Sequence, residues 1–152
     1  MDLSGDGDFF TLLTASYARH VGRPLVPAGA DAWWLYEQAP FGLLAHDTDP
    51  DPVFVYANRT AQRAFEYDWD EFTALPSRYS AEPVNRAERD QLIETVARDN
   101  YVAGYRGLRI AKSGRRFWIE EVTMWNLRHP DGGYAGQAAI FPRWTDQVAI
   151  TT

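Results

Sequence analysis

Apolar residues recur along this chain with two different periods, and the change between them separates predicted helices from predicted strands. Over residues 9–21 they repeat every three to four positions, which predicts an amphipathic helix. Asp8 is placed to cap that helix and Gly22 to end it. Residues 23–30 form a connector rich in proline and glycine, and a second short helix is predicted over residues 31–38.

A strand-like pattern begins at residue 41. Residues 41–46 and 53–57 are predicted to be two strands, because an Asp- and Pro-rich turn separates them. Three more strands are predicted at residues 102–111, 116–127 and 134–144, joined by turns that contain glycine. The C-terminal third therefore reads as a three-stranded antiparallel meander.

Residues that cap helices mark the segment between the two groups of strands. Asn58 directly follows the second strand and is placed to cap a helix over the next seven residues. Asp68 and Glu71 have the spacing of a capping box, which predicts a further turn of helix. Asn85 and Glu88 repeat that spacing and predict the start of a long helix that ends near residue 100.

The order of these elements predicts an α+β fold. We expect a single five-stranded antiparallel sheet with helices on one face, plus an N-terminal amphipathic helix. A chain of 152 residues is long enough for one well-filled core and too short for two. Residues 1–30 are expected to pack on the domain or on a second subunit, and residues 31–148 to form the domain itself.

The composition excludes several classes of function. Hydrophobic residues make up 45% of the chain and aromatic residues 14%, which is typical of a globular protein and not of a disordered one. The net charge of −6 argues against a nucleic-acid surface. Because the chain has no cysteine, disulfides, thiolate catalysis and Cys-ligated zinc are excluded. No apolar stretch is long enough for a membrane span and no apolar signal core is visible, so we expect a cytoplasmic protein.

Two short segments connect this pattern with a known superfamily. Tyr56-Ala57-Asn58 ends the second strand, and Gly114-Arg115-Arg116-Phe117-Trp118 opens the fourth. In this order of elements the chain resembles the PAS superfamily of sensor domains. More closely, it resembles the small bacterial form of the MEKHLA domain, a PAS-like family. The segments that carry this closer resemblance are Gly22-Arg23-Pro24-Leu25, Tyr36-Glu37-Gln38-Ala39-Pro40-Phe41, Leu75-Pro76-Ser77-Arg78, Trp125-Asn126-Leu127 and Gly136-Gln137-Ala138-Ala139.

The resemblance implies a site. PAS domains typically hold a small ligand, or a partner, between their helices and the inner face of the sheet. The residues expected to bound such a ligand-binding cavity here are His46, Tyr56, Ser77, Arg78, Arg109, Glu121 and Trp125.

Strand alternation assigns the residues of the fourth strand to two faces. The inward row is expected to be Ile119, Glu121, Thr123 and Trp125. The outward row is then Trp118, Glu120, Val122 and Met124. Since this outward row is largely apolar, the N-terminal helix or a second subunit is expected to cover it.

Two arginines make an anionic ligand a reasonable expectation. If Arg78 and Arg109 both faced the cavity, their guanidinium groups would match the two oxygens of a carboxylate. The alternative is that each arginine pairs with a nearby acid. Glu121 is a candidate partner for Arg109, because both residues fall on the same predicted face.

No cofactor or metal is predicted. In the flavin-binding blue-light branch, the reactive cysteine would lie where this chain has Ser77, and a serine cannot form the thiol–flavin adduct. The flavin's amide contacts would fall at Arg109, Ile119 and Ala138, of which the last two leave its polar edge unpaired. Heme is not expected either, since residues 85–100 contain no histidine.

Three acidic residues near the end of the first strand are candidate metal ligands. Asp47, Asp49 and Asp51 have the spacing of a calcium loop. That loop requires glycine and glutamate where this chain has Pro52 and Asn58. We therefore expect an ordinary hairpin turn.

Three functional hypotheses remain open. The leading one is a PAS-like sensory or ligand-binding module, homodimeric, that signals by dimerisation or by docking to a separate output protein. The second is a small enzyme that uses the cavity as an active site, with His46 and Glu121 as acid and base. The third is an interaction module with a solid interior and no ligand.

Overall fold

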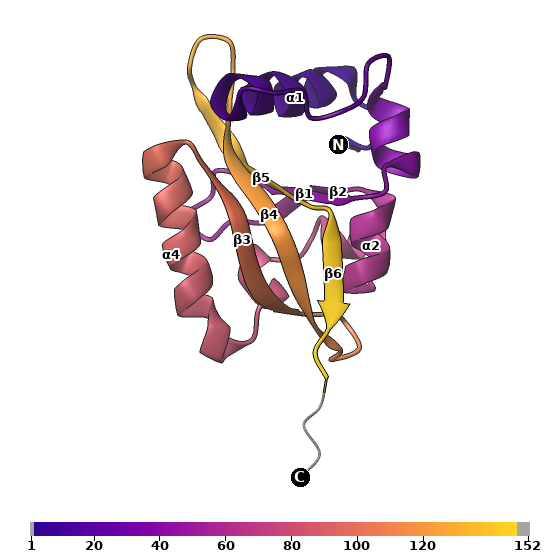
Figure 1. Ribbon diagram of the computed structural model, residues 1–152, viewed down its shortest axis with the longest axis vertical. Helices are drawn as coiled ribbons and strands as arrows, with labels where there is room; N and C mark the ends of the chain where they lie inside the picture. The colour runs from indigo at the N-terminus through magenta and orange to yellow at the C-terminus, as the bar shows by residue number, and fades with distance from the viewer. Residues whose placement is uncertain (1, 149–152) are drawn as a thin grey trace.

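The computed structural model describes residues 2–148, in which helices pack on both faces of a six-stranded antiparallel sheet (Figure 1). In chain order the elements are α1 (Gly7–Val21), the π-helical turn η1 (Trp34–Gln38), β1 (Gly42–His46), β2 (Phe54–Ala57), α2 (Arg59–Phe65), α3 (Trp69–Phe72), the 3-10 turn η2 (Ser77–Ser80), α4 (Pro83–Asp99), β3 (Tyr101–Ile110), β4 (Arg116–Arg128), β5 (Tyr134–Phe141) and β6 (Arg143–Asp146). The strand order is β2-β1-β5-β4-β3, and β6 also pairs with β4. The predicted α+β class is confirmed. Within the described residues, no helix is both long and apolar enough to cross a bilayer.

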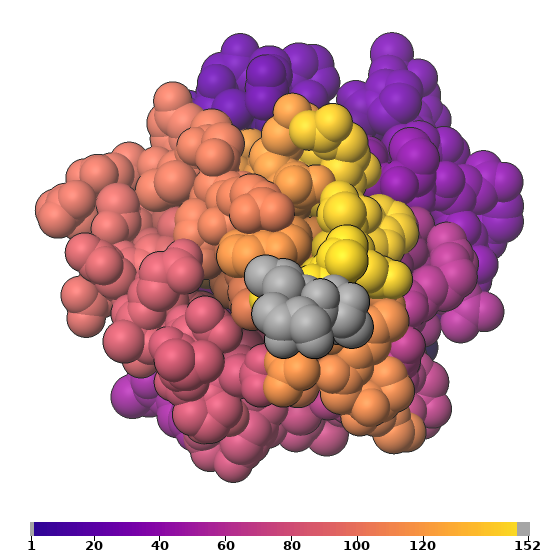
Figure 2. Space-filling view, turned by 60° about the horizontal axis from the view of Figure 1, so that its bottom comes forward, coloured from indigo at the N-terminus to yellow at the C-terminus, as the bar shows by residue number. Residues whose placement is uncertain are grey.

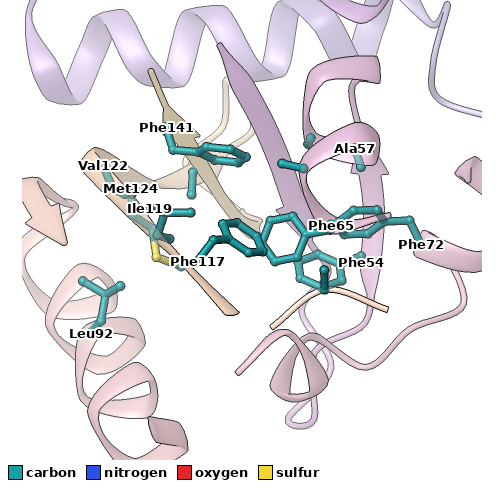
Figure 3. Packing of buried hydrophobic residues seen from close by; sticks show 14 of the residues in the cluster. Phe54, Ala57, Phe65, Phe72, Leu92, Phe117, Ile119, Val122, Met124 and Phe141 are labelled. Carbon is teal, nitrogen blue, oxygen red and sulfur yellow. The ribbon is translucent and has the colours of Figure 1, made fainter. Parts of the chain in front are cut away.

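The sheet separates two hydrophobic clusters. The inner cluster lies between the sheet and α2, α3 and α4, and Figure 3 shows its aromatic centre, where Phe65 meets Phe117 edge to face at 4.9 Å. The outer cluster lies under α1, which crosses the other face of the sheet in Figure 1. There the Tyr17 ring packs edge-on against Trp125, with ring centroids 4.9 Å apart.

The helices between the strands start where their caps predict. Asn58 accepts a hydrogen bond from the Ala61 amide at 3.0 Å, so α2 begins at Arg59 as expected. Asp68 and Glu71 form the predicted capping box at the start of α3. Both predictions are confirmed. A cap depends on residues that are close in the sequence, and tertiary packing does not override it here.

Two other predicted helix starts are wrong. Asp6, and not Asp8, caps α1 by accepting from the Phe9 amide at 2.8 Å. The long helix α4 begins at Pro83, before the expected Asn85, and the Asn85 side-chain oxygen is buried without a partner. Proline is favoured in the first turn of a helix, since its missing N–H and fixed φ cost nothing there.

A β-bulge in β4 overturns the predicted alternation of that strand. Val122 pairs with Tyr105 and Ile119 pairs with Gly107, so β4 contains one more residue than β3 between these pairs. Glu121 occupies the bulge with a φ of 53°, in the left-handed region. A bulge shifts every later side chain to the opposite face.

The inward row is therefore correct only as far as Ile119. Beyond the bulge, Val122 and Met124 belong to the inner cluster, whereas Trp125 belongs to the outer cluster under α1. Thr123 pairs with Ile140, which also packs on the outer cluster. The predicted outward row is therefore wrong for Val122 and Met124. The residues of β4 that α1 covers are others, among them Trp125 and Leu127.

The last predicted strand, 134–144, is two strands. β5 ends at Phe141 and β6 begins at Arg143. Pro142 lies between them and has no amide hydrogen for a ladder, which explains the break. After it, β6 pairs with the first half of β4, from Phe117 to Glu120. In Figure 2 β6, in yellow, lies beside orange β4 on the surface.

Candidate functional site

A small cavity lies between α4 and the inner face of the sheet. Its volume is about 50 Å³, and since one water needs roughly 10–15 Å³ by the same measure, it has room for roughly three to five waters. Its polar wall is built from five side chains on four elements, namely His46, Ser80, Arg89, Tyr105 and Arg109. The remaining wall is apolar and includes Leu44, Phe54, Phe65, Leu92, Ile93, Ile119, Val122, Met124, Ala139 and Phe141.

Arg89 and Arg109 bring two positive charges to this cavity. Arg89 lies on α4 and Arg109 on β3, and each residue is 6% exposed. Arg89 donates to the Ser77 hydroxyl and, at 3.2 Å, to Asp90 on the rim. Arg109 donates to the Leu108 carbonyl at 2.9 Å and to the Tyr105 hydroxyl at 3.3 Å. None of the described residues that line the cavity is an aspartate or a glutamate.

The charge of Arg109 affects Arg89, and the charge of Arg89 affects His46. Burial, and then the charge of Arg109, lowers the pKa of Arg89 to about 10, so Arg89 stays protonated at neutral pH. Burial, and then the charge of Arg89, lowers the pKa of His46 to about 4. His46 is therefore neutral at physiological pH. A buried cation without a buried counter-charge costs several kcal/mol, and the acid that pairs with Arg89, Asp90, is exposed.

His46 belongs to a row of buried polar side chains. Its Nε2 donates to Gln137 at 3.1 Å. The Gln137 amide in turn donates to Asn126 at 3.1 Å and to the Ile93 carbonyl on α4 at 3.2 Å. Asn126 donates to the Val96 carbonyl at 3.0 Å. The row thus ties one wall of the cavity to the C-terminal half of α4.

The sequence of β3 places Arg109 by local packing. Tyr105, Gly107 and Arg109 alternate onto the inner face, and a Cβ on Gly107 would lie 2.3 Å from the Tyr105 hydroxyl and 2.8 Å from Arg109 Nη1. Glycine therefore leaves the space in which these two side chains fold over the strand. Tyr105 also donates to the exposed Glu88 at 2.7 Å, which holds the tyrosine from the α4 side.

Of the residues expected at the site, His46 and Arg109 line the cavity and Ser77 contacts it through Arg89. Arg78 lies outside on the surface, where it pairs with Asp51. For Arg78 the nearby-acid alternative thus describes the structure. For Arg109 it does not, because the expected partner Glu121 lies elsewhere.

The other three expected residues are not brought together. Glu121 is exposed in the bulge and pairs with Arg143 at 2.8 Å. Tyr56 lies in the outer cluster, because a register shift in β2 puts Phe54 on the inner face and Tyr56 on the other. Trp125 is also in the outer cluster. An acid–base pair of His46 and Glu121 therefore does not exist in this fold.

Arg89 is not among the predicted site residues, although the sequence contains a pattern that indicates its burial. Arg89, Leu92, Ile93 and Val96 have the spacing i, i+3, i+4, i+7, which is one face of a helix. An arginine within an otherwise apolar face is a candidate buried charge. Tyr105 could have been found from the strand period of two, because it lies four residues before Arg109 and therefore on the same face.

The residues present do not fit a flavin or a heme. Ile119 faces the cavity but offers no hydrogen bond to a flavin edge, and Ala138 lies in the outer cluster. No histidine lies on the described α4 helix to ligate a heme iron. The space of a few waters is also far smaller than either group.

A depression on the surface lies directly outside the cavity. Arg89 and Ile93 contribute to the walls of both, so Arg89 stands between the enclosed space and solvent. The depression is also lined by Arg78, Arg86 and three acidic residues. Arg89 is the charged residue that the depression and the cavity share.

Comparisons with known proteins agree with this architecture. The chain is similar to the crystal structure of a PAS domain from Colwellia psychrerythraea, with a TM-score of 0.61 and 14% identity over 74% of this chain and 90% of that one. It is similar to a light-oxygen-voltage domain studied with a flavin analogue, with a TM-score of 0.57 and 16% identity over 70% and 77% of the two chains. An RNA-binding light-oxygen-voltage receptor gives a TM-score of 0.59 and 19% identity over 79% of this chain and 35% of that one.

At these identities the structural likenesses establish the fold. A search of curated proteins finds no match. The model of the MEKHLA domain family, however, matches residues 7–146, from the start of α1 to the end of β6. Since this match covers nearly the whole chain, the protein belongs to the MEKHLA domain family, with a PAS-like fold.

Proposed function

We propose that this protein is a sensory module that binds a small anion in the cavity between α4 and the sheet. The observation that carries the proposal is the pair of buried arginines, Arg89 and Arg109, beside one cavity whose described lining holds no carboxylate. An anion bound there would supply the missing counter-charge through charge-assisted hydrogen bonds. The membership of a PAS-like family supports the sensory part of the proposal.

The response to the anion would arise at α4. Arg89 lies on this helix and Arg109 on β3, so an anion between them would draw the helix and the strand together. The same movement of α4 would alter the row of hydrogen bonds that runs from His46 through Gln137 to this helix. We propose that the altered surface changes homodimerisation or the docking of a separate output protein. Sedimentation velocity with and without the bound anion tests the first of these routes.

Anion binding can be tested by the thermal stability of the protein. Acetate, nitrate and phosphate are added in turn at constant ionic strength, with chloride as the baseline. A ligand that binds only the folded state raises the melting temperature in proportion to ln(1 + [L]/Kd). We expect at least one of these anions to raise it in the wild type and in Arg98→Met, an exposed arginine on the same helix.

The same anion is expected to have no effect on Arg89→Met and Arg109→Met. Without any anion, these two variants should lose little stability, because each removes a buried charge that lacks a buried partner. If the two variants respond to the anion as the wild type does, the proposed site is wrong. If no anion stabilises the wild type, anion sensing itself is wrong.

A further inference from the structure

The chemistry of the cavity wall narrows the class of anion, on the premise that the proposed anion site exists. We infer that the ligand is a short-chain monocarboxylate, with its carboxylate between Arg89 and Arg109 and its alkyl end against the apolar wall. Three features of the cavity support this inference. They are the N–H donors that remain on the two arginines, the apolar wall that offers no partner to a second charged group of the ligand, and the cavity volume.

Both arginines have N–H groups without a hydrogen-bond partner among the described residues. A guanidinium carries five N–H groups, and Arg89 and Arg109 each use two of them on groups within the described residues. Three therefore remain on each side chain. A carboxylate accepts two parallel N–H bonds from one guanidinium and has further lone pairs for the other. The Tyr105 hydroxyl already accepts from Arg109 and donates to Glu88, so it adds no free donor.

The rest of the wall does not suit a second charge. Leu92 on α4 points toward Val122 and Met124 on β4, as Figure 3 shows. Leu44, Ala139 and Phe141 continue this apolar wall on the sheet. His46 is neutral at physiological pH, since its pKa lies at about 4. The second carboxylate of a dicarboxylate would therefore be buried without a partner, at a cost of several kcal/mol.

An inorganic oxyanion fits the same wall poorly. Phosphate or sulfate carries oxygen atoms on every side, and those turned away from the arginines would face Leu92, Val122 and Met124. A carboxylate gathers its oxygens at one end and presents carbon at the other. The volume of about 50 Å³ corresponds to roughly three to five waters. Because bonded atoms lie closer together than separate waters do, this space suits a molecule of about four to six non-hydrogen atoms.

The test is a binding series by calorimetry at constant ionic strength. The probes are sodium acetate, propionate, butyrate, hexanoate, succinate and phosphate. Each buried methylene should tighten binding about fourfold from acetate to butyrate, whereas hexanoate exceeds the cavity and should bind more weakly than butyrate. Succinate and phosphate should bind at least tenfold more weakly than propionate.

A cavity variant separates this inference from the proposed function. Val122→Ala enlarges the apolar end of the cavity and leaves both arginines in place. The carboxylate that binds this variant most tightly should therefore have a longer alkyl chain than the one that binds the wild type most tightly. Arg98→Met is the matched surface control and should keep the wild-type series. If phosphate or succinate binds best, or if chain length has no effect while binding still depends on Arg89 and Arg109, the monocarboxylate inference is overturned and the anion site stands. If no probe binds, or if binding survives Arg109→Met unchanged, both fail.

Discussion

His46 is a buried residue whose protonation should be visible in the stability of the whole protein. Its pKa is lowered from 6.5 to about 4, first by burial and then by the charge of Arg89. Between these two values the unfolded chain binds a proton at this position and the folded protein does not. The free energy of unfolding should therefore decrease as the pH falls from 6.5 toward 4.

The size of the stability loss follows from the size of the pKa shift of His46. At about 1.4 kcal/mol per pH unit, the loss reaches about 3 kcal/mol at most near pH 4. Urea denaturation of the wild type and of His46→Gln, in a buffer without carboxylates, isolates it. The difference between the two proteins should grow as the pH falls from 6.5 to 5. Groups with a lowered pKa that both proteins share, such as Glu66 and His20, cancel in this comparison. A difference that is flat with pH would mean that His46 is not buried as described.

The strands show what a single inserted residue does to a predicted face. Arg109 and His46 line the cavity as expected. The pairing of β1 with β5, and that of residues 107–110 with β4, contain no register shift. Glu121 and Trp125 do not line the cavity, because the extra residue in β4 reverses the alternation at that point.

Bulges leave little trace in a sequence. The φ of 53° at Glu121 lies in the left-handed region. A glycine at this position would have indicated such a conformation, whereas a glutamate gives no signal for it. Tyr56 was placed wrongly for the same reason, through the shift between β1 and β2. Helix caps at Asn58 and Asp68 were predictable because each depends on residues three positions apart. The order of the elements was thus within reach of the sequence, while the positions of Tyr56, Glu121 and Trp125 depended on strand irregularities.

The bulge in β4 gives a prediction for Glu121. Holding a residue other than glycine in the left-handed region costs about 1 kcal/mol or more, and most for a β-branched side chain. Glu121→Gly should therefore keep or increase the stability, even though it removes the exposed pair with Arg143. Glu121→Val should lower it by about 1–3 kcal/mol. Glu121→Ala removes the same ion pair without β-branching and should fall between them. Chemical denaturation measures all three, and equal stability of the Val and Gly variants would contradict the bulge.

At the scale of the molecule, two hydrophobic clusters pack on opposite faces of one sheet, and we expect them to unfold together. The inner cluster holds the cavity and the outer cluster holds α1. Trp125 and Met124 are neighbours on β4 that pack into different clusters, so this strand contributes to the packing of both faces. The Ser16 hydroxyl also donates to the Arg128 carbonyl and accepts from its amide, at 3.2 and 3.0 Å, which fixes α1 to the end of β4.

Leu13 tests whether α1 unfolds together with the sheet or is an attachment to it. Its side chain is completely buried in the outer cluster, and a buried leucine changed to alanine costs about 2–5 kcal/mol. If α1 folds together with the sheet, Leu13→Ala should lower the global free energy of unfolding by this amount, and Trp fluorescence and far-UV circular dichroism should report one shared transition. Thr11→Ala, on the exposed side of the same helix, should change little. The opposite result would be a variant in which only the amides of residues 7–21 exchange faster while the rest of the chain keeps its protection. In that case α1 would be a detachable cover of the outer face, and the sheet with its cavity would be stable without it.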